Sequence, residues 1–147
     1  MIQRIQTVYI IISAILLSLL FLIPFAEIAK DGLVYLFDFK GISVDGALKE
    51  NGYAISVLIC IIIVLHGIAI LSYKNRIRQI RLMVFSILLM LGLFGMFFFF
   101  TYYTFTDAQV SFKISVIFPV IAIILDYLAI RAIGKDEALI RSIDRIR

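Results

Sequence analysis

The sequence is poor in the residues that form cross-links, metal centres and reactive thiols. Its 147 residues include one cysteine, Cys60, one histidine, His66, and no tryptophan. A single cysteine excludes an internal disulfide, a thiol pair and a cysteine metal cluster. A metal site normally needs several ligands, so one histidine and one carboxylate do not form one. We therefore expect no metal site.

The motifs of common membrane enzymes and exporters are also missing. The chain has no HExxH, GxSxG or phosphate-binding loop. Quinone-linked disulfide oxidases need cysteine pairs, and claudin-like junction proteins carry a tryptophan with paired cysteines. Small multidrug exporters rely on a glutamate within the first span, whereas Glu27 follows the first apolar segment. We therefore expect a protein that is not an enzyme, with no catalytic residues and no cofactor.

Apolar residues are what the chain has in abundance. They make up 63% of the sequence, against roughly half in a soluble protein. A soluble core of this size cannot hide so much apolar surface, which makes lipid the natural solvent. The net charge of +4 does not indicate nucleic acid, because the basic residues flank apolar segments, where they orient a membrane protein.

Charge is absent from three long segments, residues 5–26, 51–73 and 82–106. Each can cross a hydrocarbon core of about 30 Å as a helix rising about 1.5 Å per residue. A fourth segment, 114–130, contains Asp126, whose cost of about 3 kcal/mol is outweighed by the surrounding Ile, Leu, Val and Phe residues. The sequence thus predicts helices over about 5–26, 53–73, 82–104 and 112–132.

The first span has an alternative interpretation as a cleaved signal peptide that begins at Arg4. Its apolar stretch is longer than a signal core, and no A-x-A site clearly follows it. We expect a retained helix, and cleavage would leave the orientation of the other spans unchanged.

The positions of Lys and Arg predict the orientation. One side carries Arg4, Lys74, Arg76, Arg78, Arg81, Arg131, Lys135, Arg141, Arg145 and Arg147. The other carries Lys30, Lys40, Lys49 and Lys113 among six acidic residues. The positive-inside rule makes the first side cytoplasmic, so both termini should lie in the cytoplasm.

The external segment, residues 27–52, shows strand and turn signals. Residues 33–40 alternate with a period of two, with aromatic side chains on one face, and Asp31-Gly32 and Asp45-Gly46 favour turns. We expect a small cap, which a β-hairpin could form, resting on the outer helix ends. The alternative is an edge or aromatic face offered to a partner. The aromatic run at 97–105 is typical of interface anchors, and a lipid- or ligand-binding patch is the alternative.

The tail, residues 133–147, predicts a short basic amphipathic helix. Arg141, Arg145 and Arg147 accompany apolar residues at helical spacing. Such a helix normally lies on anionic headgroups. We therefore regard these arginines as candidate contacts to lipid headgroups or, alternatively, to a cytosolic partner.

Asp126 and His66 are the polar residues that stand out at membrane depth. They lie at comparable distances from the basic ends of spans that run in the same direction. Our hypothesis is that they face each other inside the bundle, as a pair that carries a proton or holds a polar ligand. Alternatively, Asp126 reaches toward the interface and His66 bonds a helix carbonyl.

The two ends of the chain carry a family resemblance. Met1–Thr7 and Lys135–Arg147, together with the predicted spans, resemble the bacterial domain-of-unknown-function family 4293, found mainly in Bacteroidota. The resemblance covers essentially the whole chain. It implies an inner-membrane protein of a Gram-negative cell and carries over no site residues.

These observations predict one domain, 1–147, an all-α bundle of four transmembrane helices with an external cap between the first two. The expected function is that of a small subunit or accessory factor of a membrane or envelope complex. Its partners would be membrane lipid and another membrane or envelope protein, without nucleic acid, and a homo-oligomer is compatible with this. The alternatives are a small transporter or proton-linked carrier using Asp126 and His66, and a lipid-binding, membrane-organising protein.

Overall fold

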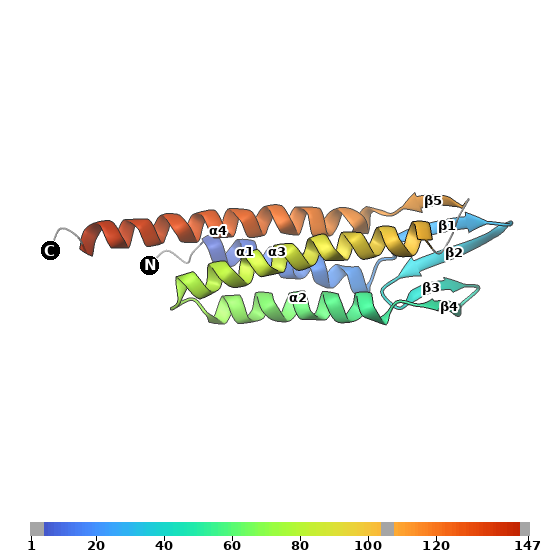
Figure 1. Cartoon of the computed structure of the whole chain (residues 1–147), viewed down its shortest axis with the longest axis horizontal. Coiled ribbons are helices and arrows are strands. Elements are labelled where there is room, and N and C mark those ends of the chain that lie inside the picture. The colour runs from blue at the N-terminus through green and yellow to red at the C-terminus, as the bar shows by residue number, and fades with distance from the viewer. Residues whose placement is uncertain (1–4, 104–107, 145–147) are drawn as a thin grey trace.

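The computed structural model describes residues 5–103 and 108–144, with side chains as far as residue 138. The helical segments of this part are α1 (Ile5–Ser18), the 3-10 turn η1 (Leu19–Phe21), α2 (Tyr53–Leu71), α3 (Arg76–Phe98), the π-helical turn η2 (Phe99–Tyr103), the 3-10 turn η3 (Ile114–Val116) and α4 (Ile117–Asp144). The strands are β1 (Ala26–Lys30), β2 (Leu33–Asp38), β3 (Gly41–Val44), β4 (Ala47–Asn51) and β5 (Gln109–Phe112). The helices lie side by side, with the sheet at one end and the start of α1 and the end of α4 at the other (Figure 1).

Three helices of the described part are long and apolar enough to cross a membrane, and they comprise Tyr53–Leu71, Arg76–Tyr103 and Ile114–Ala138. The N-terminal helix is apolar but shorter, ending with η1 at Phe21. Large apolar side chains such as Val57, Leu88 and Ile124 are exposed on the outside of the bundle. Apolar side chains can face lipid without a free-energy penalty, whereas exposing them to water is unfavourable. The chain is a multi-pass membrane protein.

The buried residues on each helix have the same sequence spacing, with alternating steps of four and three residues. The inward series are Gln6, Ile10, Ser13 and Leu17 on α1; Ile55, Ile59, Ile62, His66 and Ala69 on α2; Gln79, Met83, Ser86, Met90, Leu93 and Phe97 on α3; and Ala122, Asp126, Ala129 and Ile133 on α4. An average step of 3.5 keeps one seam facing the partner helices. This is the spacing of the a and d positions in a left-handed bundle.

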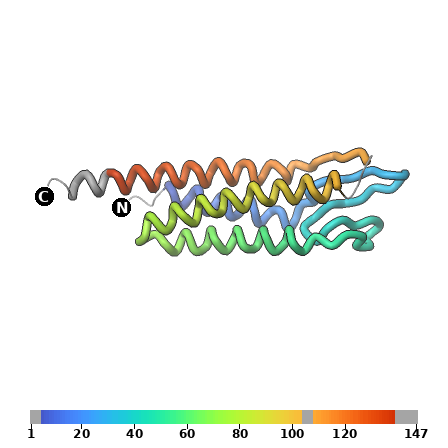
Figure 2. The backbone as a smooth tube through the Cα atoms, in the orientation of Figure 1, coloured from blue at the N-terminus to red at the C-terminus, as the bar shows by residue number. Residues whose placement is uncertain are grey.

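Several helix bounds differ from the sequence-based ones. The first helix ends before residue 26, because Pro24 cannot donate a helical hydrogen bond and Phe25 already pairs with Phe37 in the sheet. Helix α3 begins at Arg76, ahead of residue 82, since long basic side chains keep their charges in water while the backbone is helical. Helix α4 continues to Asp144, so this part of the expected tail helix is an extension of the fourth span. It extends past the α2–α3 turn (Figure 2).

The cap is larger than a hairpin, and its sheet makes the all-α class incomplete. The described strands form one antiparallel sheet in the order β4-β3-β2-β1-β5. The turns Asp31-Gly32 and Asp45-Gly46 both have positive φ at their two residues, which is the geometry of tight two-residue hairpins. Strand β5 comes from the α3–α4 connection and completes the edge beside β1.

The inner face of the sheet is fixed to the helix ends. Ile28, Phe37 and Ile42 are fully buried. The Phe37 ring packs at 5.2 Å from that of Phe25 and at 6.1 Å from that of Phe97 on α3. Aromatic contacts of this kind add to the apolar area that the sheet buries. The sheet therefore rests on one end of the helix bundle, and it occupies the place of the expected cap.

We predict that Gly41→Ala destabilises the cap. The φ of Gly41 is +129°, and an added Cβ would lie 2.0 Å from the carbonyl oxygen of Glu50. The strain should lower the Tm in detergent by about 5 °C or more. Gly67→Ala on α2 is the control, since its Cβ would meet no atom within 4 Å. Equal Tm values for the two variants would show that the close approach of Gly41 on β3 to Glu50 on β4 does not require glycine.

Candidate functional site

A polar layer crosses the middle of the helix bundle. Its members are fully buried and come from α1, α2, α3 and α4 in turn: Ser13, His66, Ser86 and Asp126. Apolar clusters lie on both sides of it. One contains Leu17, Ile62, Met90 and Ala122, and the other contains Ile10, Met83, Ala69 and Ala129. Each polar residue takes an inward position of the three-four repeat, which turns it toward the core. The apolar clusters on both sides place the four residues at one level.

The structure brings His66 and Asp126 together. His66 Nε2 lies 3.1 Å from Asp126 Oδ1 and 3.0 Å from Ser13 Oγ. On the other side of the ring, His66 Nδ1 lies 2.8 Å from the carbonyl oxygen of Ile62 in the preceding turn of α2. Ser13 Oγ also donates to the carbonyl oxygen of Ala122, at 3.4 Å. These contacts join α1, α2 and α4.

The hydrogen bonds limit where the protons of the site can lie. A carbonyl oxygen only accepts, so Nδ1 of His66 donates its hydrogen to Ile62. Nε2 faces both Ser13 Oγ and Asp126 Oδ1. Without a hydrogen it accepts from the Ser13 hydroxyl, and with one it donates to the Asp126 carboxyl group. The second arrangement brings opposite charges together, which lowers the cost of burying them.

One acceptor of the site is left over. Asp126 Oδ2 is buried and has no hydrogen-bond partner among the residues that the structure describes, and the same holds for Ser86 Oγ. Buried polar atoms are seldom left without partners. The free carboxyl oxygen can accept a hydrogen bond from a water, a proton carrier or a polar ligand. The described residues include no group of three or more His, Cys, Asp or Glu side chains that could hold a metal ion.

Sequence reasoning missed Ser13 and Ser86. Serine is common inside membrane helices, and Ser18 shows the ordinary case, since its hydroxyl donates to the Ala14 carbonyl oxygen of its own helix at 2.8 Å. The usable signal was the spacing. Ser13 lies one heptad after Gln6 and Ser86 one heptad after Gln79, and Gln6 and Gln79 are also buried.

The other candidates either lie outside the described residues or do not belong to this layer. The side chain of Arg141 and the whole of Arg145 and Arg147 lie outside the described residues. Within the aromatic run, Phe97 is buried under the sheet, whereas Phe98 and Phe99 are exposed and stack on Tyr102 and Tyr103. Cys60 is exposed on α2.

We predict a strong coupling between His66 and Asp126 in stability. His66→Leu or Asp126→Leu alone leaves one buried polar group without its partner and should lower the Tm by about 5 °C or more. The double variant removes both groups and should be closer to the wild type, with a coupling of about 2 kcal/mol. Thermal unfolding in detergent measures this, with Ser18→Ala as a neutral control. Additive effects would show that the two side chains do not depend on each other.

The comparison with known proteins gives a family. No curated protein and no solved structure is similar enough to the chain to count as a match. One family model does match, and it covers residues 2–146, which is nearly the whole sequence. The chain therefore belongs to the family described as Domain of unknown function (DUF4293).

Proposed function

We propose that the protein is a non-enzymatic subunit or accessory factor that binds another membrane or envelope protein through its sheet. The observation that carries the proposal is the difference between the two faces of this sheet. The inner face is buried on the helix ends, whereas Val34, Leu36 and Leu48 on the outer face are 57%, 41% and 50% exposed. This face extends beyond the ends of the membrane helices (Figure 1). Apolar groups exposed there favour a protein partner.

The edges of the sheet offer a second means of binding. Strand β4 is at one end of the strand order, and all its residues, Ala47–Asn51, are exposed. An edge strand presents unpaired N–H and C=O groups to an incoming strand. An extended segment of the partner can pair with β4 while its apolar side chains cover Leu36 and Leu48.

The membrane placement that we propose puts the sheet outside and both termini in the cytoplasm of a bacterial inner membrane. Two observations support it. Helix α1 begins and helix α4 ends at the end of the bundle opposite the sheet (Figure 1). In the sequence, ten of the fourteen basic residues precede α1, flank the α2–α3 connection, or lie in the second half of α4 and beyond it, which is the distribution that the positive-inside rule expects of a cytoplasmic side.

A charged residue introduced on the outer face of the sheet should therefore weaken binding of the partner. We expect Leu36→Glu to reduce recovery of a co-purifying protein by about tenfold or more, because a carboxylate would be buried in the contact. The measurement is isolation of the tagged protein from its native membrane in mild detergent, followed by mass spectrometry.

Leu33→Glu is the matched control for this experiment. It makes the same change on the same strand, but on the opposite face, at a residue that is 45% exposed and pairs with Lys30. The proposal fails if no stoichiometric partner is recovered, or if Leu36→Glu retains the partner as well as Leu33→Glu does.

A second candidate function, a proton-linked carrier, is favoured by the His66–Asp126 contact and the free Asp126 Oδ2. Asp126→Asn separates the two functions. We expect a subunit with this change to insert, fold and retain its partner. A carrier would instead lose proton flux into liposomes that contain a pH-sensitive dye, while remaining folded. Flux in the wild type that disappears in Asp126→Asn and His66→Ala would replace our proposal with the carrier.

A further inference from the structure

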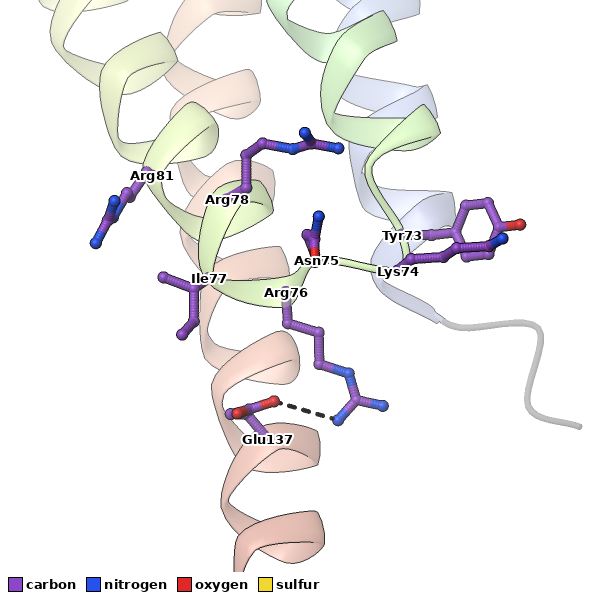
Figure 3. Close-up of a pocket in the computed structure, with 8 residues that line it drawn as sticks. All are labelled: Tyr73, Lys74, Asn75, Arg76, Ile77, Arg78, Arg81 and Glu137. Carbon is purple, nitrogen blue, oxygen red and sulfur yellow. Dashed lines mark ion pairs between the residues drawn. The ribbon is translucent and has the colours of Figure 1, made fainter.

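A cavity of about 780 Å³ lies at the α2–α3 turn (Figure 3). This turn is at the end of the bundle opposite the sheet (Figure 1). Its lining comes from the turn, the first turns of α3 and the extension of α4: Tyr73, Lys74, Asn75, Arg76, Ile77, Arg78, Arg81 and Glu137. Four of these side chains are basic and one is acidic. The cavity therefore carries an excess of positive charge.

The basic side chains leave the α2–α3 turn in different directions. Arg76 extends toward Glu137 on α4, and Arg78 extends across the gap toward α2 (Figure 3). The Lys74 ammonium lies 5.9 Å from the ring centroid of Tyr73. Arg81 points to the other side of α3 (Figure 3). The first three side chains therefore begin close to Asn75 at the start of α3, and Arg81 adds charge from the far side of the helix.

The single acidic group does not satisfy this cluster. Arg76 Nη1 lies 3.6 Å from Glu137 Oε2, which is ion-pair distance. The same nitrogen is buried and has no hydrogen-bond partner in the described part of the chain. A buried guanidinium N–H without an acceptor is costly. An acceptor oxygen from a ligand in the cavity would remove that cost.

The start of α3 adds to the positive potential. Asn75 forms no side-chain cap, and the first turn of α3 contains no acidic residue. The N-terminal end of a helix already has a partial positive charge, so arginines in that turn raise the potential further. Free amide groups and arginines together provide the donors that a phosphate group accepts.

We propose that this cavity binds the phosphate headgroup of an anionic phospholipid from the adjoining leaflet. The neighbouring apolar surface favours a lipid over a soluble anion. Leu71, at the end of α2, is 77% exposed, and Ile77 beside the arginines is also exposed. The cations therefore lie where the span meets the headgroup region, with apolar surface available for an acyl chain. The site lies at the opposite end of the molecule from the proposed protein contact and is independent of it.

The test compares lipids that differ only in the headgroup. Purified protein in detergent is titrated with phosphatidylglycerol or phosphatidylcholine of the same acyl chains, and bound lipid is counted by native mass spectrometry. We expect the wild type to prefer phosphatidylglycerol. Each cation at a membrane surface contributes about fivefold to binding, so Arg76→Gln with Arg78→Gln should weaken phosphatidylglycerol binding more than tenfold.

The control removes the same charge from the same end of the bundle. Arg131→Gln with Lys135→Gln changes exposed residues on α4 that do not line the cavity, and binding should stay within about twofold of the wild type. An equal loss in both double variants would mean that only the overall charge matters, which overturns the proposal. Arg78→Gln alone leaves the Arg76–Glu137 pair intact. It should keep the wild-type Tm and weaken binding about fivefold, and unchanged binding would also overturn the proposal.

Inorganic phosphate distinguishes the lipid from a free anion. Millimolar phosphate is added to the protein before phosphatidylglycerol, and the thermal shift and the bound lipid are measured. We expect no thermal shift and no displacement. A stabilising shift by phosphate that depends on Arg76 and Arg78, with displacement of the lipid, would assign the cavity to a soluble anion.

Discussion

The carboxyl group of Asp126 must be enclosed by protein, because neither lipid nor an apolar helix face can solvate it. The enclosure requires α4 to turn this residue inward, α2 to present His66, and α1 to bring Ser13 to the same level. Three helices are thereby fixed in rotation and in height. The apolar contacts above and below then fill the space that this arrangement leaves. Lipid is as apolar as the helices, so apolar residues alone would specify their rotation poorly.

The sheet end of the molecule is held by different contacts. The Phe25, Phe37 and Phe97 rings join the α1–β1 link, the sheet and α3. Ser115 donates to the Pro24 carbonyl oxygen at 2.6 Å, and Lys113 lies 2.7 Å from Glu27. These contacts link the α1–α2 connection to the α3–α4 connection, although the two connections are far apart in the sequence. With the membrane placement that we propose, water reaches this end, and burial of aromatic surface then favours the contacts here more than it does among the lipid-facing helices.

The sequence predicted the three longer apolar helices and the facing of His66 and Asp126, because charge is rare and conspicuous in an apolar chain. The turns at Asp31-Gly32 and Asp45-Gly46 likewise indicated a hairpin. The inward seam stayed hidden, since residues such as Ile59 and Ile61 are equally apolar although only the first is buried. Strand β5 could not be predicted either. Its partner β1 lies far away in the sequence, and residues Gln109–Phe112 show little alternation of polar and apolar side chains. The early end of α1 followed from a pairing of Phe25 with Phe37 that only the folded cap creates.

Helix α4 is an unbroken rod of 28 residues, or about 42 Å, which is longer than a hydrocarbon core of about 30 Å. At one end it follows β5, which is hydrogen-bonded to β1, and at the other it extends past the remaining helices. A stiff rod transmits displacement with little loss. A displacement of its extended end would therefore be passed along α4 toward the β5 edge of the sheet, from which only Lys113 and the short η3 turn separate it.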